Sequence, residues 1–342
     1  MRLLSFISAA LVAIGASVAA AQSNGTVVEG PFPADLNGSN FTYPYPVKLF
    51  RFTSQARELE MAFMDVAPSC KVPNGKTALL LHGKNFCGAT WEGTIQALSK
   101  AGYRVIAPDQ IGFCKSSKPD WYQYSLHQFA YNTVGLLDTL GVDKVTVIGH
   151  SLGGMLTTRF GLLYPERVNE LVIVNAVGLE DYTAKGVPYV SIDTTTATEA
   201  ASSYGSIRGY EQVAYYVNEW RPEYDTWVNM LVNIYYGSER DAYVKIQARI
   251  VDLVLTQSVA HEFKNLKPRT LLMIGEKDIT AIGSQWAPPE VAAQLGHFDK
   301  LGRQVVRQLQ DGTLIRFPEL GHAPQISNPK LFHKKLLKWL DN

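Results

Sequence analysis

The fold is decided by the stretch Val147-Ile148-Gly149-His150-Ser151-Leu152-Gly153-Gly154, in which an apolar run leads into the pattern G-x-S-x-G. Residues 144–148 predict a short buried strand, and residues 152–160 predict a helix whose small residues allow close packing on a sheet. The glycines around the serine leave room for a sharp turn, so Ser151 projects its hydroxyl group where the amides of the new helix face incoming negative charge. This context favours a nucleophilic serine over an ordinary serine in a glycine-rich loop.

Strands and helices alternate along much of the chain. The run at residues 77–82 is continuously apolar, which is typical of a strand buried on both faces. Alternation of this kind predicts an α/β fold, with a mostly parallel sheet and helices on both faces. Strands are predicted at residues 47–52, 59–66, 77–82, 103–107, 144–148, 170–174, 269–274 and 313–317, and helices at residues 91–101, 125–140, 152–160 and 329–340.

The alternation breaks at residues 180–262, which predict helices without strands between them. We interpret this stretch as a helical cap inserted between two strands of the sheet. Its aromatic side chains could line an apolar or aromatic pocket, or could pack the cap onto the core. Residues 279–289, which include Trp286, could form another pocket wall. The cap aromatics are Tyr204, Tyr210, Tyr215, Tyr216, Trp220, Tyr224, Trp227, Tyr235, Tyr236 and Tyr243.

Composition narrows the class of partner. The 342 residues are 46% hydrophobic and 18% charged, enough to bury a large core, and 32 basic against 31 acidic residues give a net charge of +1. There is no basic run that would indicate nucleic acid or an anionic membrane surface as a partner. A small-molecule substrate is the expected partner, and the oligomeric state stays open.

The amino terminus predicts a secretory signal peptide over residues 1–21. Met1-Arg2 is a short positive region, residues 3–18 are apolar, and Ala19-Ala20-Ala21 ends the stretch with small residues. An uncleaved membrane anchor is disfavoured because the apolar stretch is short and ends at a cleavage-like site. We therefore expect a secreted protein, or a periplasmic one in a bacterium, with no stable membrane association after cleavage.

Residues 22–46 predict a polar, exposed leader that carries three glycosylation sequons, at Asn24, Asn37 and Asn40. In a eukaryotic source we expect glycans at these positions. In a bacterial chain the three sequons would not indicate glycosylation.

A serine hydroxyl needs a histidine to take its proton and an acid to orient that histidine. Asp278 follows the apolar strand 271–274, and His322 lies in a loop between the last strand and the last helix. Glu276 comes two residues too early to be preferred, and Glu180 is a weaker rival for the acid. Ser151, Asp278 and His322 follow one another in the order found in α/β-hydrolases.

Catalysis by a serine also needs amide donors for the oxyanion of a tetrahedral intermediate. The amide of Leu152 is the first candidate. The second is expected from the loop His82-Gly83-Lys84-Asn85, through the amide of Lys84 or Asn85, because there the chain leaves a buried strand. Simple turn chemistry is the alternative explanation of this loop.

Several motifs together resemble the α/β-hydrolase superfamily, from residue 47 to the carboxyl end. Within it the chain resembles the capped, serine-nucleophile branch, which is related to esterases, C–C bond hydrolases and epoxide hydrolases. The resemblance implies a core built from residues 47–179 and 263–342 around the cap at residues 180–262. The motifs are His82-Gly83, Asp109-Gln110-Ile111-Gly112-Phe113-Cys114-Lys115-Ser116, Gly149 to Gly154, Gly275 to Asp278 and Gly321-His322.

A departure from some relatives narrows the chemistry. Epoxide hydrolases and haloalkane dehalogenases of this superfamily use an aspartate nucleophile, whereas this chain has Ser151. We expect a serine hydrolase that cleaves an ester, thioester or lactone of an apolar or aromatic small molecule through an acyl-enzyme. The alternatives are a C–C bond hydrolase or perhydrolase with the same triad, and a non-catalytic ligand-binding homologue. No cofactor or metal is implied.

The three cysteines exclude a disulfide scaffold, and their odd count leaves at least one unpaired within the chain. In the architecture that the resemblance implies, the strands before the Gly83 and Asp109 loops are neighbours. We therefore predict a Cys87–Cys114 disulfide that holds the oxyanion loop, with Cys70 free. Two buried free thiols are the alternative.

Overall fold

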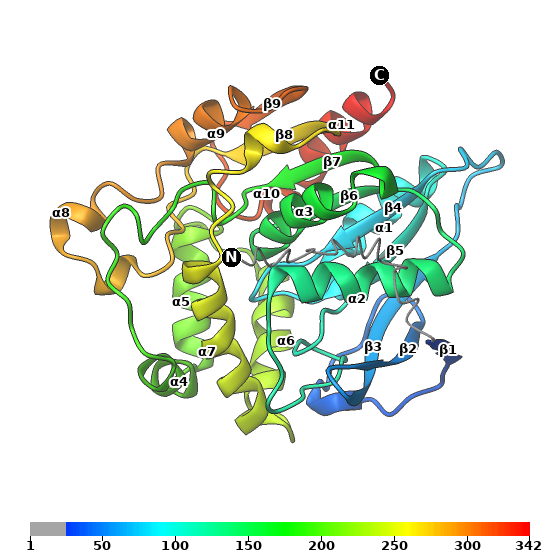
Figure 1. Ribbon diagram of the computed structural model, residues 1–342, viewed down its shortest axis with the longest axis horizontal. Helices are drawn as coiled ribbons and strands as arrows, with labels where there is room; N and C mark the ends of the chain where they lie inside the picture. Colours follow the sequence, from blue (N-terminus) through cyan, green and yellow to red (C-terminus); the bar gives the residue numbers. More distant parts are fainter. Residues whose placement is uncertain (1–24) are drawn as a thin grey trace, which may run out of the picture.

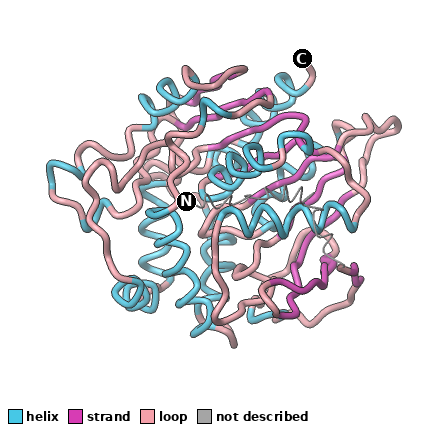
Figure 2. Tube along the Cα trace, in the orientation of Figure 1, coloured by secondary structure: helices cyan, strands magenta, loops and turns pink. Residues whose placement is uncertain are grey.

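The computed structural model describes residues 25–342. The predicted signal peptide, residues 1–21, and Asn24 lie outside this range. Within it, no helix is long and apolar enough to cross a membrane. The described chain forms one nine-stranded sheet with helices on both faces, as Figures 1 and 2 show, and the predicted α/β fold is confirmed.

The sheet is mostly parallel, in the order β1-β2-β3-β5-β4-β6-β7-β8-β9. Its first three strands and the β3–β5 pair are antiparallel, and every pair from β5–β4 onward is parallel. The carboxyl ends of β4, β6, β7, β8 and β9 therefore lie at the same edge of the sheet. The strands are β1 Thr26–Glu29, β2 Val47–Ser54, β3 Arg57–Val66, β4 Thr77–Leu81, β5 Arg104–Pro108, β6 Val145–His150, β7 Val168–Val174, β8 Arg269–Gly275 and β9 Gly312–Phe317.

The continuously apolar strands separate two hydrophobic cores. In β4, Leu79 and Leu81 face one core and Leu80 faces the other, because successive side chains of a strand point to opposite faces. Helices α2, α3 and α9 cover the first face, and α1 and α11 cover the second. The helices outside the cap are α1 Glu92–Lys100, α2 Leu126–Thr139, α3 Leu152–Leu163, α8 Pro289–Ala292, α9 Phe298–Val306, α10 Pro324–Ser327 and α11 Pro329–Leu340.

Between β7 and β8 the chain leaves the sheet and forms four helices, which Figure 1 shows grouped on one side of the molecule. These cap helices are α4 Ile192–Ala200, α5 Tyr204–Ala214, α6 Asp225–Tyr235 and α7 Arg240–Thr256, inside the predicted cap range of 180–262. Serines at the starts of α4 and α5 accept hydrogen bonds from backbone amides of the first turn, which stabilises these helix ends. The cap packs against the edge of the sheet that carries Ser151, as the contacts below establish.

The segment before β2 differs from the predicted polar, exposed leader. β1 pairs with β2, and Ser39 is fully buried. Lys115 Nζ donates hydrogen bonds to the carbonyl oxygens of Ala34 and Ser39, both at 2.7 Å. The segment therefore packs on the core, through the side chains of Phe41, Tyr43 and Tyr45 and through the backbone carbonyls that Lys115 binds.

Candidate active site

Ser151 lies at a sharp turn between β6 and α3. Its backbone has φ 58° and ψ −121°, a conformation that L residues rarely adopt and that costs on the order of 1–3 kcal/mol. The neighbouring glycines permit the turn: a Cβ on Gly149 would lie 2.0 Å from the Gly153 carbonyl oxygen, and one on Gly153 would lie 2.1 Å from that of Leu81. The sequence pattern thus has a steric cause, and it leaves the serine where strand and helix meet.

His322 and Asp278 form a fully buried hydrogen-bonded pair. His322 Nδ1 lies 2.7 Å from Asp278 Oδ2, and neither side chain is exposed to solvent. His322 Nε2 is buried and makes no hydrogen bond to any described residue, Ser151 included. The imidazole is therefore oriented by the acid through one nitrogen, while the other nitrogen is left without a partner.

Asn175 holds the acid in place, a contact that the sequence analysis missed. Its Nδ2 donates to Asp278 Oδ2 at 2.9 Å, and its Oδ1 accepts from the Gly275 amide at 2.8 Å. The Thr280 amide donates to the other carboxylate oxygen of Asp278 at 2.8 Å. Asn175 is fully buried at φ 37°, a left-handed conformation that asparagine tolerates better than most residues. The sequence feature that could have identified this contact is an asparagine directly after the buried strand β7.

Apart from Asp278, aromatic rings surround the side chain of His322. Its ring centroid lies 4.8 Å from that of Tyr215 and 4.7 Å from that of His150. Burial lowers the pKa of His150 well below its usual range, and the charge of His322 lowers it further, so His150 adds no positive charge. The His322 amide donates to the carbonyl oxygen of Ala214 at 3.1 Å, which ties the histidine loop to the end of cap helix α5.

The loop after β4 lies directly against Ser151. A Cβ on Gly83 would come 2.8 Å from Ser151 Cβ. The Phe86 amide donates to the Gly83 carbonyl at 3.2 Å, closing a turn whose central residues are Lys84 and Asn85. The amides of the two central residues take no part in that closing bond. Leu152 directly follows Ser151 and begins α3, and the Lys84–Asn85 turn directly follows Gly83, so the candidate oxyanion donors lie on two segments that meet at the serine.

Cys87 and Cys114 are joined by a disulfide with a Cα–Cα distance of 5.9 Å, and Cys70 is a free thiol. This is the pairing that the resemblance implied. Beside the bridge, Asp109 accepts hydrogen bonds from the amides of Gly88 and Lys115, at 2.7 and 3.1 Å, and from the hydroxyl of Tyr43 at 2.6 Å. In the described chain the two sulfurs and this carboxylate are the one close grouping of metal-ligand atoms, and all three are already engaged.

The rival acids are engaged elsewhere. Glu180 pairs with Lys185 and accepts from the Gly296 amide at 2.8 Å. Glu276 forms a two-pronged ion pair with Arg316. Asp278 alone of the three carboxylates is hydrogen-bonded to His322.

Comparison with known proteins places this site in a family. Residues 77–329 match the family model described as alpha/beta hydrolase fold. The chain belongs to the alpha/beta hydrolase family. A probable hydrolytic enzyme from Pseudomonas aeruginosa PAO1 is 52% identical, with a TM-score of 0.86 over 87% of this chain and 95% of that one.

Two further relatives of this hydrolase differ in chemistry. The 2-hydroxy-6-oxo-2,4-heptadienoate hydrolase of Pseudomonas putida is 35% identical over 31% of this chain, and the match spans only 39% of that relative's length. An esterase from Exiguobacterium antarcticum shares the fold at 20% identity, with a TM-score of 0.64 over 83% of this chain and 97% of that one. Membership of the family thus leaves the substrate of this hydrolase to be argued from its own residues.

A cavity of about 430 Å³ lies between the cap and the core of the hydrolase, next to the segments that carry the triad, although Ser151, Asp278 and His322 are not among the residues that line it. Lys84 and Asn85 line it from the loop against Ser151, and Thr280 lines it two residues after Asp278. The cap supplies residues of α4, α5, α6 and α7, and residues 279–286 form another wall, as the sequence analysis expected of the segment with Trp286.

The cap aromatics divide between the two expected roles. Tyr210 and Tyr235 line the cavity. Tyr215 contacts His322 and accepts a hydrogen bond from Asn85 Nδ2 at 3.1 Å. Tyr216 and Tyr224 stack on each other at 3.6 Å, so these two pack the cap.

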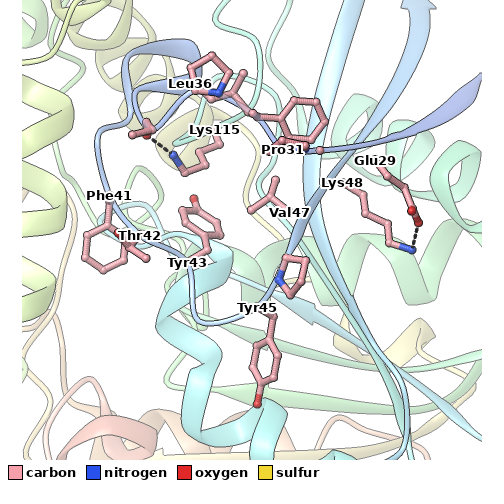
Figure 3. A pocket seen from close by; sticks show the side chains of 15 residues that line it. Glu29, Pro31, Leu36, Phe41, Thr42, Tyr43, Tyr45, Val47, Lys48 and Lys115 are labelled. Atoms are coloured by element: carbon pink, nitrogen blue, oxygen red, sulfur yellow. Dashed lines mark hydrogen bonds and ion pairs between the residues drawn. The ribbon is translucent and has the colours of Figure 1, made fainter.

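A larger cavity, of about 640 Å³, lies away from the triad. Figure 3 shows it between Leu36, Phe41, Tyr43, Tyr45 and Val47, under the segment that precedes β2. The lysines at its two ends are engaged: Lys48 pairs with Glu29, and Lys115 donates to backbone carbonyls. This larger cavity is lined by the segment before β2, by the start of β2 and by Lys115, whereas the smaller cavity is lined by the loop against Ser151 and by the residues directly after Asp278, so the smaller one is the candidate substrate pocket.

The two described sequons lie in different environments. Asn40 is exposed. Asn37 is half-buried, and its Nδ2, the atom that would carry a glycan, donates to the Lys115 carbonyl at 2.7 Å.

Proposed function

We propose that this hydrolase cleaves an ester, thioester or lactone of an apolar or aromatic small molecule, with Ser151 as nucleophile. One observation carries the proposal: His322 is hydrogen-bonded through Nδ1 to the buried Asp278, while its Nε2 has no partner among the described residues. A histidine held in this way is suited to take a proton from a serine beside it. The missing Ser151–His322 bond is consistent with this role, since such contacts often tighten only when substrate binds.

In the first half of the proposed reaction, Ser151 Oγ attacks the substrate carbonyl carbon and His322 Nε2 takes the hydroxyl proton. Asp278 stabilises the imidazolium that forms, and the amides of Leu152 and of Lys84 or Asn85 donate to the oxyanion. His322 then gives its proton to the departing oxygen or sulfur. The products of this half are the acyl-enzyme and the alcohol or thiol.

In the second half, water attacks the acyl carbonyl and loses a proton to His322 Nε2. The tetrahedral intermediate collapses, the bond to Ser151 Oγ breaks, and the serine regains a proton from His322. A carboxylic acid leaves, and the enzyme returns to its starting state.

The mature protein is proposed to be secreted, beginning at Gln22. The charged, apolar and small-residue regions of residues 1–21 support this, and so does the Cys87–Cys114 bridge, since disulfides persist in oxidising compartments. Amino-terminal sequencing of the protein from culture medium, or from the periplasm of a bacterial host, should begin at Gln22. A chain that keeps Met1 and stays in the cytoplasm would contradict this.

A substrate panel tests the reaction. We expect turnover of p-nitrophenyl esters and small lactones by the wild type, and none by Ser151→Ala. The matching Pseudomonas putida relative, named for a 2-hydroxy-6-oxo-dienoate, makes C–C cleavage the second candidate. Turnover of such a dienoate in preference to every ester would favour that candidate. Binding without turnover of either class would favour a ligand-binding homologue.

A further inference from the structure

The cavity beside the triad carries two charges of opposite sign. Lys84 extends into it from the loop against Ser151, and Glu199 faces it from cap helix α4. All other residues that line this cavity are neutral. Polar hydroxyls of Thr195, Thr198 and Ser202 lie on the α4 side, whereas the walls from α6, α7 and residues 279–286 are largely apolar.

Lys84 and Glu199 form a sheltered ion pair. Lys84 Nζ lies 2.8 Å from Glu199 Oε1, and the two side chains are 18% and 12% exposed. The hydroxyl of Tyr235 donates to the second oxygen, Oε2. Burial, and then the charge of Glu199, raise the pKa of Tyr235 well above its usual range, so this phenol keeps its proton and remains a donor. Each oxygen of Glu199 thus has a donor, and the charge of Lys84 is paired with that of Glu199.

The pair makes the cavity electrically neutral and leaves a substrate carboxylate without a free cation. Such a carboxylate would be desolvated, would meet the negative charge of Glu199, and would have to compete with it for Lys84. An uncharged chain can lie along the apolar wall without these costs. A neutral substrate hydroxyl can donate to the hydroxyl oxygens of Thr195 and Thr198, whose own protons are donated to the carbonyls of Ser191 and Thr194.

Building on the proposed serine hydrolase, we propose that Glu199 sets its substrate class: the Lys84–Glu199 pair selects uncharged substrates and rejects those that carry a carboxylate. Glu199 does not touch the reacting atoms and acts by occupying Lys84. Removing its charge should convert the site to one that accepts carboxylates, because Lys84 is then free to pair with them.

Two esters of equal chain length test this: p-nitrophenyl hexanoate and the p-nitrophenyl monoester of adipate. The wild type should prefer the hexanoate in kcat/KM. Glu199→Gln keeps the shape and an acceptor for Lys84, and should raise the adipate/hexanoate ratio of kcat/KM roughly 10- to 100-fold, the worth of one charge-assisted hydrogen bond. The double variant Lys84→Met, Glu199→Gln should lose that gain, since the cation is gone.

Matched controls separate this effect from general loss of charge or of structure. Glu262→Gln breaks another ion pair, with Arg159, outside the cavity, and should leave the ratio unchanged. Tyr235→Phe keeps the Lys84–Glu199 pair and should keep the preference for hexanoate. Melting temperatures identify any variant that fails to fold, and the wild-type preference tests the idea without any substitution.

The outcomes separate this proposal from the proposed function. Equal turnover of both esters by the wild type, or an unchanged ratio in folded Glu199→Gln, would overturn the role of Glu199 while leaving the serine hydrolase standing. If the wild type cleaves neither these esters nor the lactones of the substrate panel, the proposed reaction is wrong, and calorimetric binding of the intact esters to Ser151→Ala still decides the selectivity. Tighter binding of the adipate ester there would overturn the proposal, and tighter binding of the hexanoate would support it.

Discussion

Asn175 offers a sharp test because one side chain links the acid of the triad to the end of strand β8. Asn175→Ala removes a hydrogen bond to Asp278, worth about 1.5–3 kcal/mol because its acceptor is a carboxylate. It also leaves the buried Gly275 amide unpaired, which costs about 1–3 kcal/mol. We expect the free energy of unfolding to fall by about 3–5 kcal/mol. With Asp278 less well oriented, kcat should fall roughly 10- to 100-fold.

The assay combines urea unfolding with steady-state hydrolysis of a p-nitrophenyl ester. Asn132→Ala is the matched control: Asn132 is buried in α2, donates to the Tyr122 hydroxyl at 3.0 Å and accepts from Gln128 Nε2 at 2.8 Å. This control should lose stability and keep kcat. A kcat for Asn175→Ala that matches the control would refute the reasoning, since the asparagine would then be structural only.

Three further predictions concern stability and modification. Glu211 in α5 is fully buried and its carboxylate oxygens have no partner among the described residues, and burial raises its pKa from 4.5 to about 8. The folded state therefore holds a proton that the unfolded state releases, so the unfolding free energy should fall as pH rises from about 4.5 to about 8, and urea titrations of Glu211→Gln should show a flatter profile. Replacing Cys87 and Cys114 by alanine opens a loop with a sequence separation of 27. Chain-entropy arguments put the cost at about 3.5 kcal/mol, and an unchanged denaturation midpoint would contradict it. In a eukaryotic secretory host, Asn40→Gln should remove one glycan by mass spectrometry, because Asn40 is exposed. Asn37→Gln should not change the mass by a glycan, because Asn37 Nδ2 donates to the Lys115 carbonyl.

The parts of the molecule that sequence predicts well are those with local causes. The turn at Ser151 needs glycines two residues before and after the serine, and Gly149 and Gly153 can be recognised in the sequence. The central strands β4, β6 and β8 are largely apolar because both faces are buried, so their positions could be predicted to within one or two residues at each end. Asp278 and His322 follow such strands, and parallel topology brings strand ends together.

The parts that sequence misses depend on contacts between distant segments. Asn175 reaches Asp278 only because β7 and β8 are neighbours and its backbone takes a left-handed turn. Lys84 and Glu199 are 115 residues apart, and their pairing depends on how the cap sits over the core. Part of the packing of the segment before β2 comes from carbonyl oxygens that Lys115 binds, and the sequence does not reveal that contact because every residue has a backbone carbonyl.

The most direct test of the central claim is mass spectrometry of the protein after reaction with a fluorophosphonate, which phosphonylates activated serines. We predict a single adduct on the peptide that contains Ser151; it should be absent in Ser151→Ala and form much more slowly in His322→Ala. An absence of any adduct in the folded wild type, or an adduct that persists in Ser151→Ala, would contradict a nucleophilic Ser151.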